Sequence, residues 1–254
     1  MKTLFSNSIL FIWITLLLCS SCDSFVDVEL PGSQLSSTNV FQDYATANAA
    51  LTNIYSKIRD RGLLTGNSSG LSDQLGNYTD ELVPYGMPSN TSFNFYYNTL
   101  LPTTPSIAGY WNATYNQIYA ANAIIEGVSL SNDLTLVQKN QFCGEALFIR
   151  ALSHLYLVNL YGDIPYVTHT DYKSNSMVTR IPAEKVYELI VKDLQESEQK
   201  LGTSYSNSQR IRPNRYVVKA LLARTYLYSG AFAEAANEAS AVLNLTGLYH
   251  LEEL

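Results

Sequence analysis

Side chains that commonly carry enzyme chemistry are sparse and scattered in this chain. The three histidines, His154, His169 and His250, are not spaced as a metal site requires, and no pair of cysteines joins them. The sequence also contains no nucleophile elbow, no phosphate-binding glycine loop and no dinucleotide-binding fingerprint. We therefore predict no catalytic residue, no metal ligand and no cofactor, and we interpret His154 as a packed residue of a long helix.

Asp80 and Glu81 are neighbouring acids in a polar segment rich in aromatic residues. Two carboxylates can hydrolyse a glycoside when they are held on opposite sides of a sugar. Adjacent residues seldom reach that geometry, so we interpret the pair as solvated loop acids. A glycosidase stays an alternative, and it predicts release of reducing sugar that Asp80→Asn or Glu81→Gln abolishes.

The segment around these acids, residues 62–109, suits the binding of an uncharged polyol. It contains no lysine or arginine, is rich in Gly, Asn, Ser, Thr and Pro, and includes six aromatic residues. A loop of this length is usually functional or disordered, and the aromatic content argues against disorder. Sugars offer flat CH faces to rings and hydroxyls to amide and phenol groups, so the candidate ligand-binding residues are Tyr85, Tyr96, Tyr97 and Asn98. Alternatively, half or more of the aromatic residues pack the loop against the helices.

The N-terminal segment indicates where such a site would be used. Lys2 precedes an apolar run over residues 4–18, after which small residues lead to Cys22. This order is typical of a secretory signal peptide, and the run is too short for a good spanning helix. Ser21 before Cys22 resembles a bacterial lipobox, although a plain signal peptide with a chance cysteine is an alternative. We expect residues 1–21 to be a lipoprotein signal peptide and Cys22 to be lipidated, which would hold the chain on a membrane surface.

The net charge bears on the possible partners, and the cysteine content bears on the possible disulfides. The formal net charge is −6 and no basic run is present, so nucleic acid is a poor candidate partner. Once Cys22 is acylated, Cys143 has no cysteine with which to form an intramolecular disulfide. We interpret Cys143 as a small buried apolar residue, with a reactive thiol as the alternative.

Apolar residues at helical spacing predict an all-α core. After the lipidated N-terminus and a linker over residues 22–42, we expect one helical domain over residues 43–254. Its expected helices are 43–59, 111–127, 136–161, 182–201, 213–229 and 232–245, with irregular chain over 62–109 and 166–180. The last two have the small–large spacing of a tetratricopeptide-like unit, so the predicted fold is an all-α stack of helical hairpins with long irregular loops. An ordinary alanine-rich hairpin is the alternative.

Four segments in order resemble the SusD/RagB family of nutrient-binding outer-membrane lipoproteins of Bacteroidota. Residues 22–27 resemble its lipidated start, and Trp111, Tyr115 and Asn122 resemble one of its helices. The helix sequence EALFIRA at 145–151, followed by YGDIP at 161–165, resembles its most specific signature. Residues 220–236 resemble its helical repeat.

The resemblance implies a non-enzymatic protein on the cell surface, anchored by lipid in the outer membrane. Such a protein lies over a SusC-like TonB-dependent transporter, captures an oligosaccharide or in some branches a peptide, and delivers it to that transporter. The family continues with a C-terminal half, so we expect residues 43–254 to be a truncated, N-terminal SusD-like domain. Because Glu145 and Arg150 lie in a mostly apolar helix, we expect them to partner buried polar groups. The alternative function is a lipid-anchored adaptor that binds only proteins, through the exposed face of residues 184–245.

Overall fold

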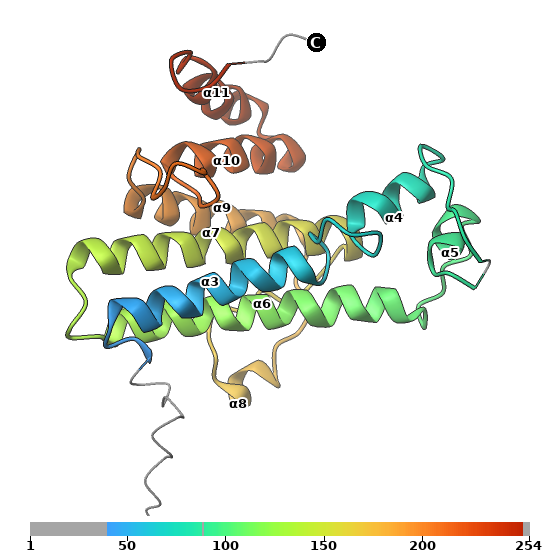
Figure 1. Cartoon of the computed structure of the whole chain (residues 1–254), viewed down its shortest axis with the longest axis horizontal. Coiled ribbons are helices and arrows are strands. Elements are labelled where there is room, and N and C mark those ends of the chain that lie inside the picture. Colours follow the sequence, from blue (N-terminus) through green and yellow to red (C-terminus); the bar gives the residue numbers. More distant parts are fainter. Residues whose placement is uncertain (1–39, 88, 251–254) are drawn as a thin grey trace, which may run out of the picture. The chain divides into compact units, whose positions relative to one another are not determined.

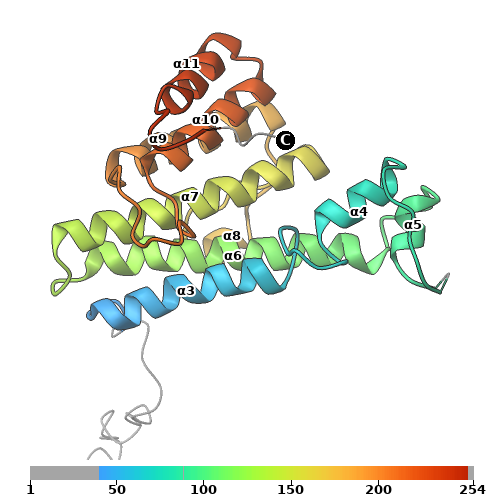
Figure 2. The same ribbon diagram turned by 45° about the horizontal axis from the view of Figure 1, so that its top comes forward.

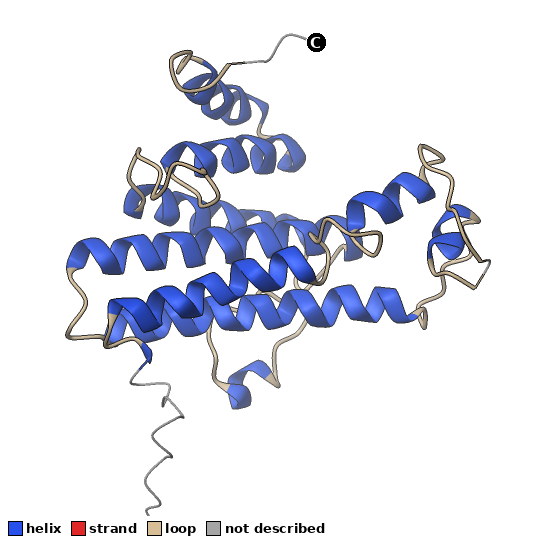
Figure 3. Ribbon diagram, viewed as in Figure 1, coloured by secondary structure: helices blue, strands red, loops and turns tan. Residues whose placement is uncertain are grey.

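A computed structural model describes residues 40–87 and 89–250 (Figure 1). The predicted signal peptide, Cys22 and most of the predicted linker lie outside these residues. Within the described residues the regular secondary structure is helical, as predicted (Figure 3). The helices are α3 (Tyr44–Asp60), α4 (Leu71–Tyr78), α5 (Ser92–Tyr96), α6 (Pro105–Leu130), α7 (Leu136–Tyr161), α8 (Tyr172–Asn175), α9 (Ala183–Lys200), α10 (Arg215–Ser229) and α11 (Phe232–Leu243). Ile164 and Ile181 form an isolated antiparallel bridge.

The long helices pack largely in chain order. α6 packs on α7, α7 on α9, α9 on α10 and α10 on α11, while α3 lies along α6 and also contacts α7 (Figures 1 and 2). Each helix therefore covers its predecessor, which is the arrangement of a helical-hairpin stack. The predicted tetratricopeptide-like fold is confirmed.

Helix ends follow local signals in the sequence. Asp43 caps α3, because its carboxylate accepts hydrogen bonds from the backbone N–H groups of the first turn. Thr135 and Gln138 form a capping box at the start of α7, which spans the predicted residues and ends at Gly162 with a φ of +69°. Gly230, in the left-handed region, separates α10 from α11.

Gly127 does not end α6, contrary to the prediction. A Cβ atom at this position would lie 2.0 Å from a ring carbon of Phe41, so the glycine makes room for that ring while the helix continues to Leu130. Phe41, which the sequence analysis assigned to the linker, is buried here. α6 also begins earlier than predicted, with Pro105 in its first turn.

Arg150 and Asp193 form a buried ion pair that joins α7 to α9. Nε and Nη2 of Arg150 each donate to one carboxylate oxygen at 2.6 Å, and each side chain is 7% exposed. Nη1 donates to Oδ1 of Asn122 on α6 at 2.8 Å, and the Tyr166 hydroxyl donates to Asp193 at 2.6 Å. Burial lowers the pKa of Arg150, but the hydrogen bonds and charge of Asp193 outweigh it and raise that pKa overall. The prediction that Arg150 serves a structural role is confirmed.

Asn122 and His154 also bind the segment that follows α7. Nδ2 of Asn122 donates to the carbonyl of Val167 at 3.1 Å, and the N–H of Val167 donates to Nε2 of His154 at 3.3 Å. His154 is fully buried, and its ring stacks on Tyr166 with centroids 3.9 Å apart. Burial lowers the pKa of His154 to about 3. His154 is therefore a neutral packed residue, as predicted.

Glu145 lies at the centre of a second polar group that fastens α3. Its carboxylate accepts from the Tyr55 hydroxyl at 2.7 Å and from Gln141 at 2.6 Å, and lies 3.7 Å from Arg212. Burial raises the pKa of Glu145, although these neighbours oppose that effect. Arg212, in the loop before α10, also donates to Asn48 at 2.9 Å and to the hydroxyl of Thr52 at 2.7 Å. Glu145 thus joins α3, α7 and this loop, as expected of a structural residue.

Cys143 is buried in the hydrophobic cluster between α3, α6 and α7. Burial raises the pKa of its thiol, so the reactive thiolate is disfavoured. The interpretation of Cys143 as a small core residue is confirmed.

Candidate functional site

The aromatic segment between α3 and α6 is a folded unit rather than a continuous irregular loop. It contains α4 and α5, which pack on each other. Leu71 and Phe95 enter the main hydrophobic cluster, and the Gln74 amide donates to the Ser92 hydroxyl at 2.9 Å. The Tyr110 hydroxyl on α6 donates to the carbonyl of Ser69 at 2.6 Å. The prediction of irregular chain over residues 62–109 was therefore wrong in detail, because two short helices lie within this segment.

Three of the four predicted ligand-binding residues lie together at the end of α5. Tyr97 is 62% exposed, and its ring meets that of Tyr96 edge-on with centroids 5.3 Å apart. The ring of Phe93 stacks on that of Tyr97, with the two centroids 5.9 Å apart. Asn98 follows at once, exposed and with a φ of +53°. This end of α5 presents an aromatic surface with an amide beside it.

Tyr85 lies apart from this group. Its side chain is fully exposed in the turn between α4 and α5, and it has no ring contact or hydrogen bond with the described residues. Phe95, by contrast, is buried in the core. The segment therefore divides its aromatic residues between packing and exposure.

Asp80 and Glu81 are both exposed just after α4, and Asp80 has a φ of +62°. Neither carboxylate lines the cleft between α3 and α6 or the groove between α4, α7 and α10 that are described below. The same residues contain no group of three histidine, cysteine or acidic side chains that could hold a metal ion.

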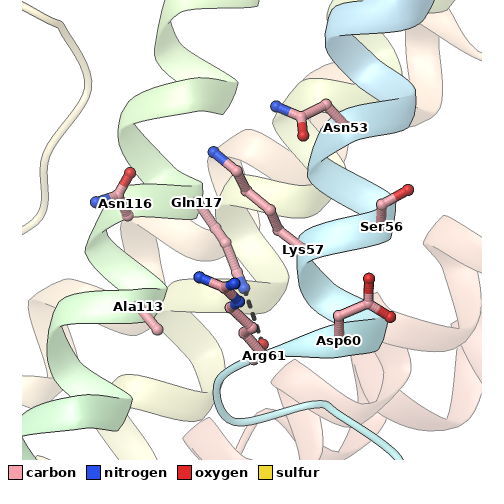
Figure 4. A pocket seen from close by; sticks show the side chains of 8 residues that line it. All are labelled: Asn53, Ser56, Lys57, Asp60, Arg61, Ala113, Asn116 and Gln117. Atoms are coloured by element: carbon pink, nitrogen blue, oxygen red, sulfur yellow. Dashed lines mark hydrogen bonds between the residues drawn. The ribbon is translucent and has the colours of Figure 1, made fainter.

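A polar cleft of about 490 Å³ lies between α3 and α6 (Figure 4). Gly62, with a φ of +87°, turns the chain directly after Arg61, and a Cβ atom there would lie 3.2 Å from that of Ala113. Gln117 is buried, and its amide donates a long hydrogen bond of 3.5 Å to the carbonyl of Arg61. The lining residues are Asn53, Ser56, Lys57, Asp60, Arg61, Ala113, Asn116 and Gln117. This cleft was not predicted, because its two walls lie far apart in the chain and each is an ordinary polar helix face.

The side chains of Lys57 and Arg61 make no close contact with an acid in the part of the chain that the structure describes, although Arg59, helped by the charge of Arg61, lowers the pKa of the neighbouring Asp60. Neither the Lys57 ammonium nor the Arg61 guanidinium forms a hydrogen bond or an ion pair there. The Asp60 carboxylate is bound by Arg59, at 2.7 and 3.0 Å. That hydrogen bonding lowers the pKa of Asp60. The cleft therefore combines two cations and side-chain amides with one carboxylate that Arg59 binds.

A smaller groove of about 190 Å³ lies between α4, α7 and α10. The Arg224 guanidinium lies over the rings of Tyr156 and Tyr228, 5.8 and 5.5 Å from their centroids. Leu75 of α4 forms part of its wall. Cation–π contact already occupies the guanidinium, so this groove is less available to a ligand than the cleft.

None of the helices among the described residues is both long enough and apolar enough to cross a membrane.

Comparison with known proteins places the chain among SusD-like proteins. Residues 24–227 match a SusD-like family described as starch-binding and associating with the outer membrane. A SusD-like protein of Formosa agariphila is 35% identical over 141 residues, which are 54% of this chain and 27% of the relative. A second SusD-like protein of that organism is 22% identical over 233 residues, 89% of this chain and 44% of the relative.

Solved structures agree with these matches. A laminarin-binding SusD-like protein superposes with a TM-score of 0.69 at 27% identity, over 78% of this chain and 43% of that protein. A SusD-like protein from Bacteroides fragilis superposes with a TM-score of 0.69 at 19% identity, over 88% of this chain and 42% of that protein, which shows likeness of fold. The chain spans less than half the length of each of these relatives.

Proposed function

The chain belongs to the SusD-like family, and from that membership we propose that it is a non-catalytic, lipid-anchored glycan-binding protein of the cell surface. It captures an oligosaccharide and delivers it to a SusC-like, TonB-dependent transporter of the outer membrane. The observation that carries the proposal is the family match over residues 24–227. A structural neighbour of 27% identity binds laminarin, which supports a glycan over a peptide as the ligand.

We assign the first contact with the glycan to the aromatic end of α5. The exposed ring of Tyr97 offers an apolar face to sugar CH groups, and the phenol and amide groups of Tyr96 and Asn98 offer hydrogen bonds to hydroxyls. Tyr85 is fully exposed in the preceding turn and is a further contact for a longer ligand.

Affinity purification tests the delivery step. The tagged full-length chain is recovered from detergent-solubilised membranes of its host, with Cys22→Ala as the control that cannot be lipidated. We expect a large β-barrel transporter to accompany the chain and to be lost or reduced with the control. A folded, lipidated chain that recovers no barrel would contradict delivery to a transporter.

Measurements of glycan binding and of glycan hydrolysis test the proposed non-catalytic binding role. We expect laminarin oligosaccharides to bind the full-length chain with no increase in reducing ends. An increase that Asp80→Asn or Glu81→Gln abolishes would show a glycosidase instead.

The alternative of a protein-binding adaptor has one observation in its favour. On the hairpin of α10 and α11, Leu227, Phe232 and Leu243 are 53%, 67% and 65% exposed. An adaptor predicts that Phe232→Asp weakens recovery of a protein partner while no glycan binds.

A further inference from the structure

The cleft between α3 and α6 is lined by Lys57 and Arg61, and a neutral sugar would leave their positive charges without a counter-charge from the ligand. We propose that the cleft binds an acidic group, a carboxylate or a sulfate, on the captured glycan. This inference rests on the proposed glycan-binding function and specifies the class of its ligand.

Two positive charges reach into the cleft from one side. Lys57 and Arg61 are four residues apart at the end of α3, which places them on one face of the chain. Figure 4 shows both side chains extending from α3 toward α6, while Ser56 points away from it. Asp60 also lines the cleft, but its carboxylate is hydrogen-bonded to Arg59 and only its charge acts on Arg61. The cleft therefore has two cations, Lys57 and Arg61, against one carboxylate that a third cation already binds.

A half-buried cation of this chain shows the contrast. The Lys219 ammonium lies 2.7 Å from Glu198 and 2.9 Å from Glu238, so two acids satisfy it. Since the chain as a whole carries a formal net charge of −6, attraction for anions is not a general property of its surface. An anion would have to be recognised locally, at cations such as those of the cleft, which no acid binds by a hydrogen bond within the described residues.

The amide side chains that line the cleft can bind the hydroxyl groups of a sugar. Asn53, Asn116 and Gln117 supply amides that can both donate to and accept from hydroxyl groups. The guanidinium of Arg61 can donate two parallel hydrogen bonds to a carboxylate or sulfate. A volume of about 490 Å³ is within the range of small-ligand sites.

A structural role for these cations makes a different prediction. Positive side chains in the last turn of a helix offset its dipole, and Lys57 and Arg59 occupy that turn of α3. If this were their whole role, removing the charges would lower the thermal stability and leave glycan binding unchanged. Binding and thermal unfolding must therefore be measured on the same variants.

The experiment is affinity electrophoresis of the full chain in detergent, through gels containing polygalacturonate, λ-carrageenan or laminarin. The test variant is Lys57→Gln/Arg61→Gln. The matched control is Lys173→Gln/Lys192→Gln, which removes two positive charges from exposed positions on α8 and α9. Polygalacturonate carries carboxylates and λ-carrageenan sulfates, so the two gels also distinguish the sources of the anion.

We expect at least one acidic glycan to retard the chain, with salt reducing the effect. The test variant should weaken that binding about tenfold or more, and the control should not. Unchanged acidic-glycan binding in the test variant, or retardation by laminarin alone, would overturn the inference and leave the proposed function standing. If none of the three glycans retards the chain, both fail together.

Discussion

We predict that Asp193→Ala destabilises the fold by about 3–5 kcal/mol, because it leaves a buried guanidinium without its counter-charge. Arg150 and Asp193 are each 7% exposed and share two hydrogen bonds of 2.6 Å. After the substitution Arg150 keeps Oδ1 of Asn122 at 2.8 Å and the carbonyl of Thr168 at 3.4 Å, neither of which carries charge. Tyr166 also loses its 2.6 Å acceptor, but its hydroxyl keeps the carbonyl of Leu189 at 3.2 Å, so the loss of the counter-charge dominates the cost.

The assay is urea unfolding followed by circular dichroism, with thermal unfolding alongside. For a domain of this size, about 3–5 kcal/mol corresponds to a fall in Tm of roughly 6–20 °C. Glu188→Ala is the control, since its pair with Lys185 is 57% exposed on both sides and should contribute less than about 1 kcal/mol.

The double variant Arg150→Met/Asp193→Leu separates a charge effect from simple loss of packing. Removing both charges together should restore much of the stability lost in the single variant, because apolar replacements of buried ion pairs are often neutral or better. A cost below about 1 kcal/mol for Asp193→Ala would refute the reasoning. So would a double variant whose cost equals the sum of the costs of Arg150→Met and Asp193→Leu measured singly, since it would show no coupling between the side chains.

Three further predictions concern the ligand surface, the core and the pH dependence. Tyr97→Ala should weaken glycan binding in titration calorimetry with little change in Tm. The control Tyr172→Ala on α8, where the ring is 82% exposed against 62% for Tyr97, should bind normally, and equal affinities of the two variants would remove Tyr97 from the site. Gly127→Ala should destabilise by about 1–3 kcal/mol in urea unfolding, because its Cβ would overlap the ring of Phe41, and a stabilised variant would contradict that contact. Burial, aided by the charge of Arg150 and opposed by a backbone hydrogen bond, lowers the pKa of His154 to about 3 from 6.5. The unfolded chain therefore binds a proton that the folded chain does not between these values, so stability should fall by about 2 kcal/mol as the pH drops from 7 to 5. His154→Gln should flatten that slope in unfolding curves across this range, and an unchanged slope would implicate other groups.

Long periodic segments could be predicted well from the sequence. α7 occupies the predicted residues 136–161, because its apolar positions, its capping box and Gly162 all agree. The short helices α4, α5 and α8 were not predicted, since four to eight residues are too few to show a helical period. Gly127 misled the prediction because its role depends on Phe41, more than eighty residues earlier in the chain.

In the candidate sites, too, residues that are consecutive in the sequence could be predicted and residues that only packing brings together could not. Tyr96, Tyr97 and Asn98 could be proposed from composition because they are consecutive, and their clustering needs no tertiary information. The cleft could not, because Lys57 and Asn116 meet only through the packing of α3 on α6. Whether a charged side chain finds a partner is likewise a property of the folded chain and is invisible in the sequence.

The attachment of α3 by Arg212 has a consequence for the order in which the chain can fold. The guanidinium binds Asn48 and Thr52 and lies 5.5 Å from the ring centroid of Tyr55, so the first helix is fastened by a residue about 160 positions later. A chain made from its N-terminus cannot complete that attachment until the loop before α10 has emerged, by which time α6 and α7 already exist. Contacts of such long sequence separation form late. Until that loop has emerged, α3 is held by its packing on α6 and α7 and by the hydrogen bond from Tyr55 to Glu145, without the contacts of Arg212.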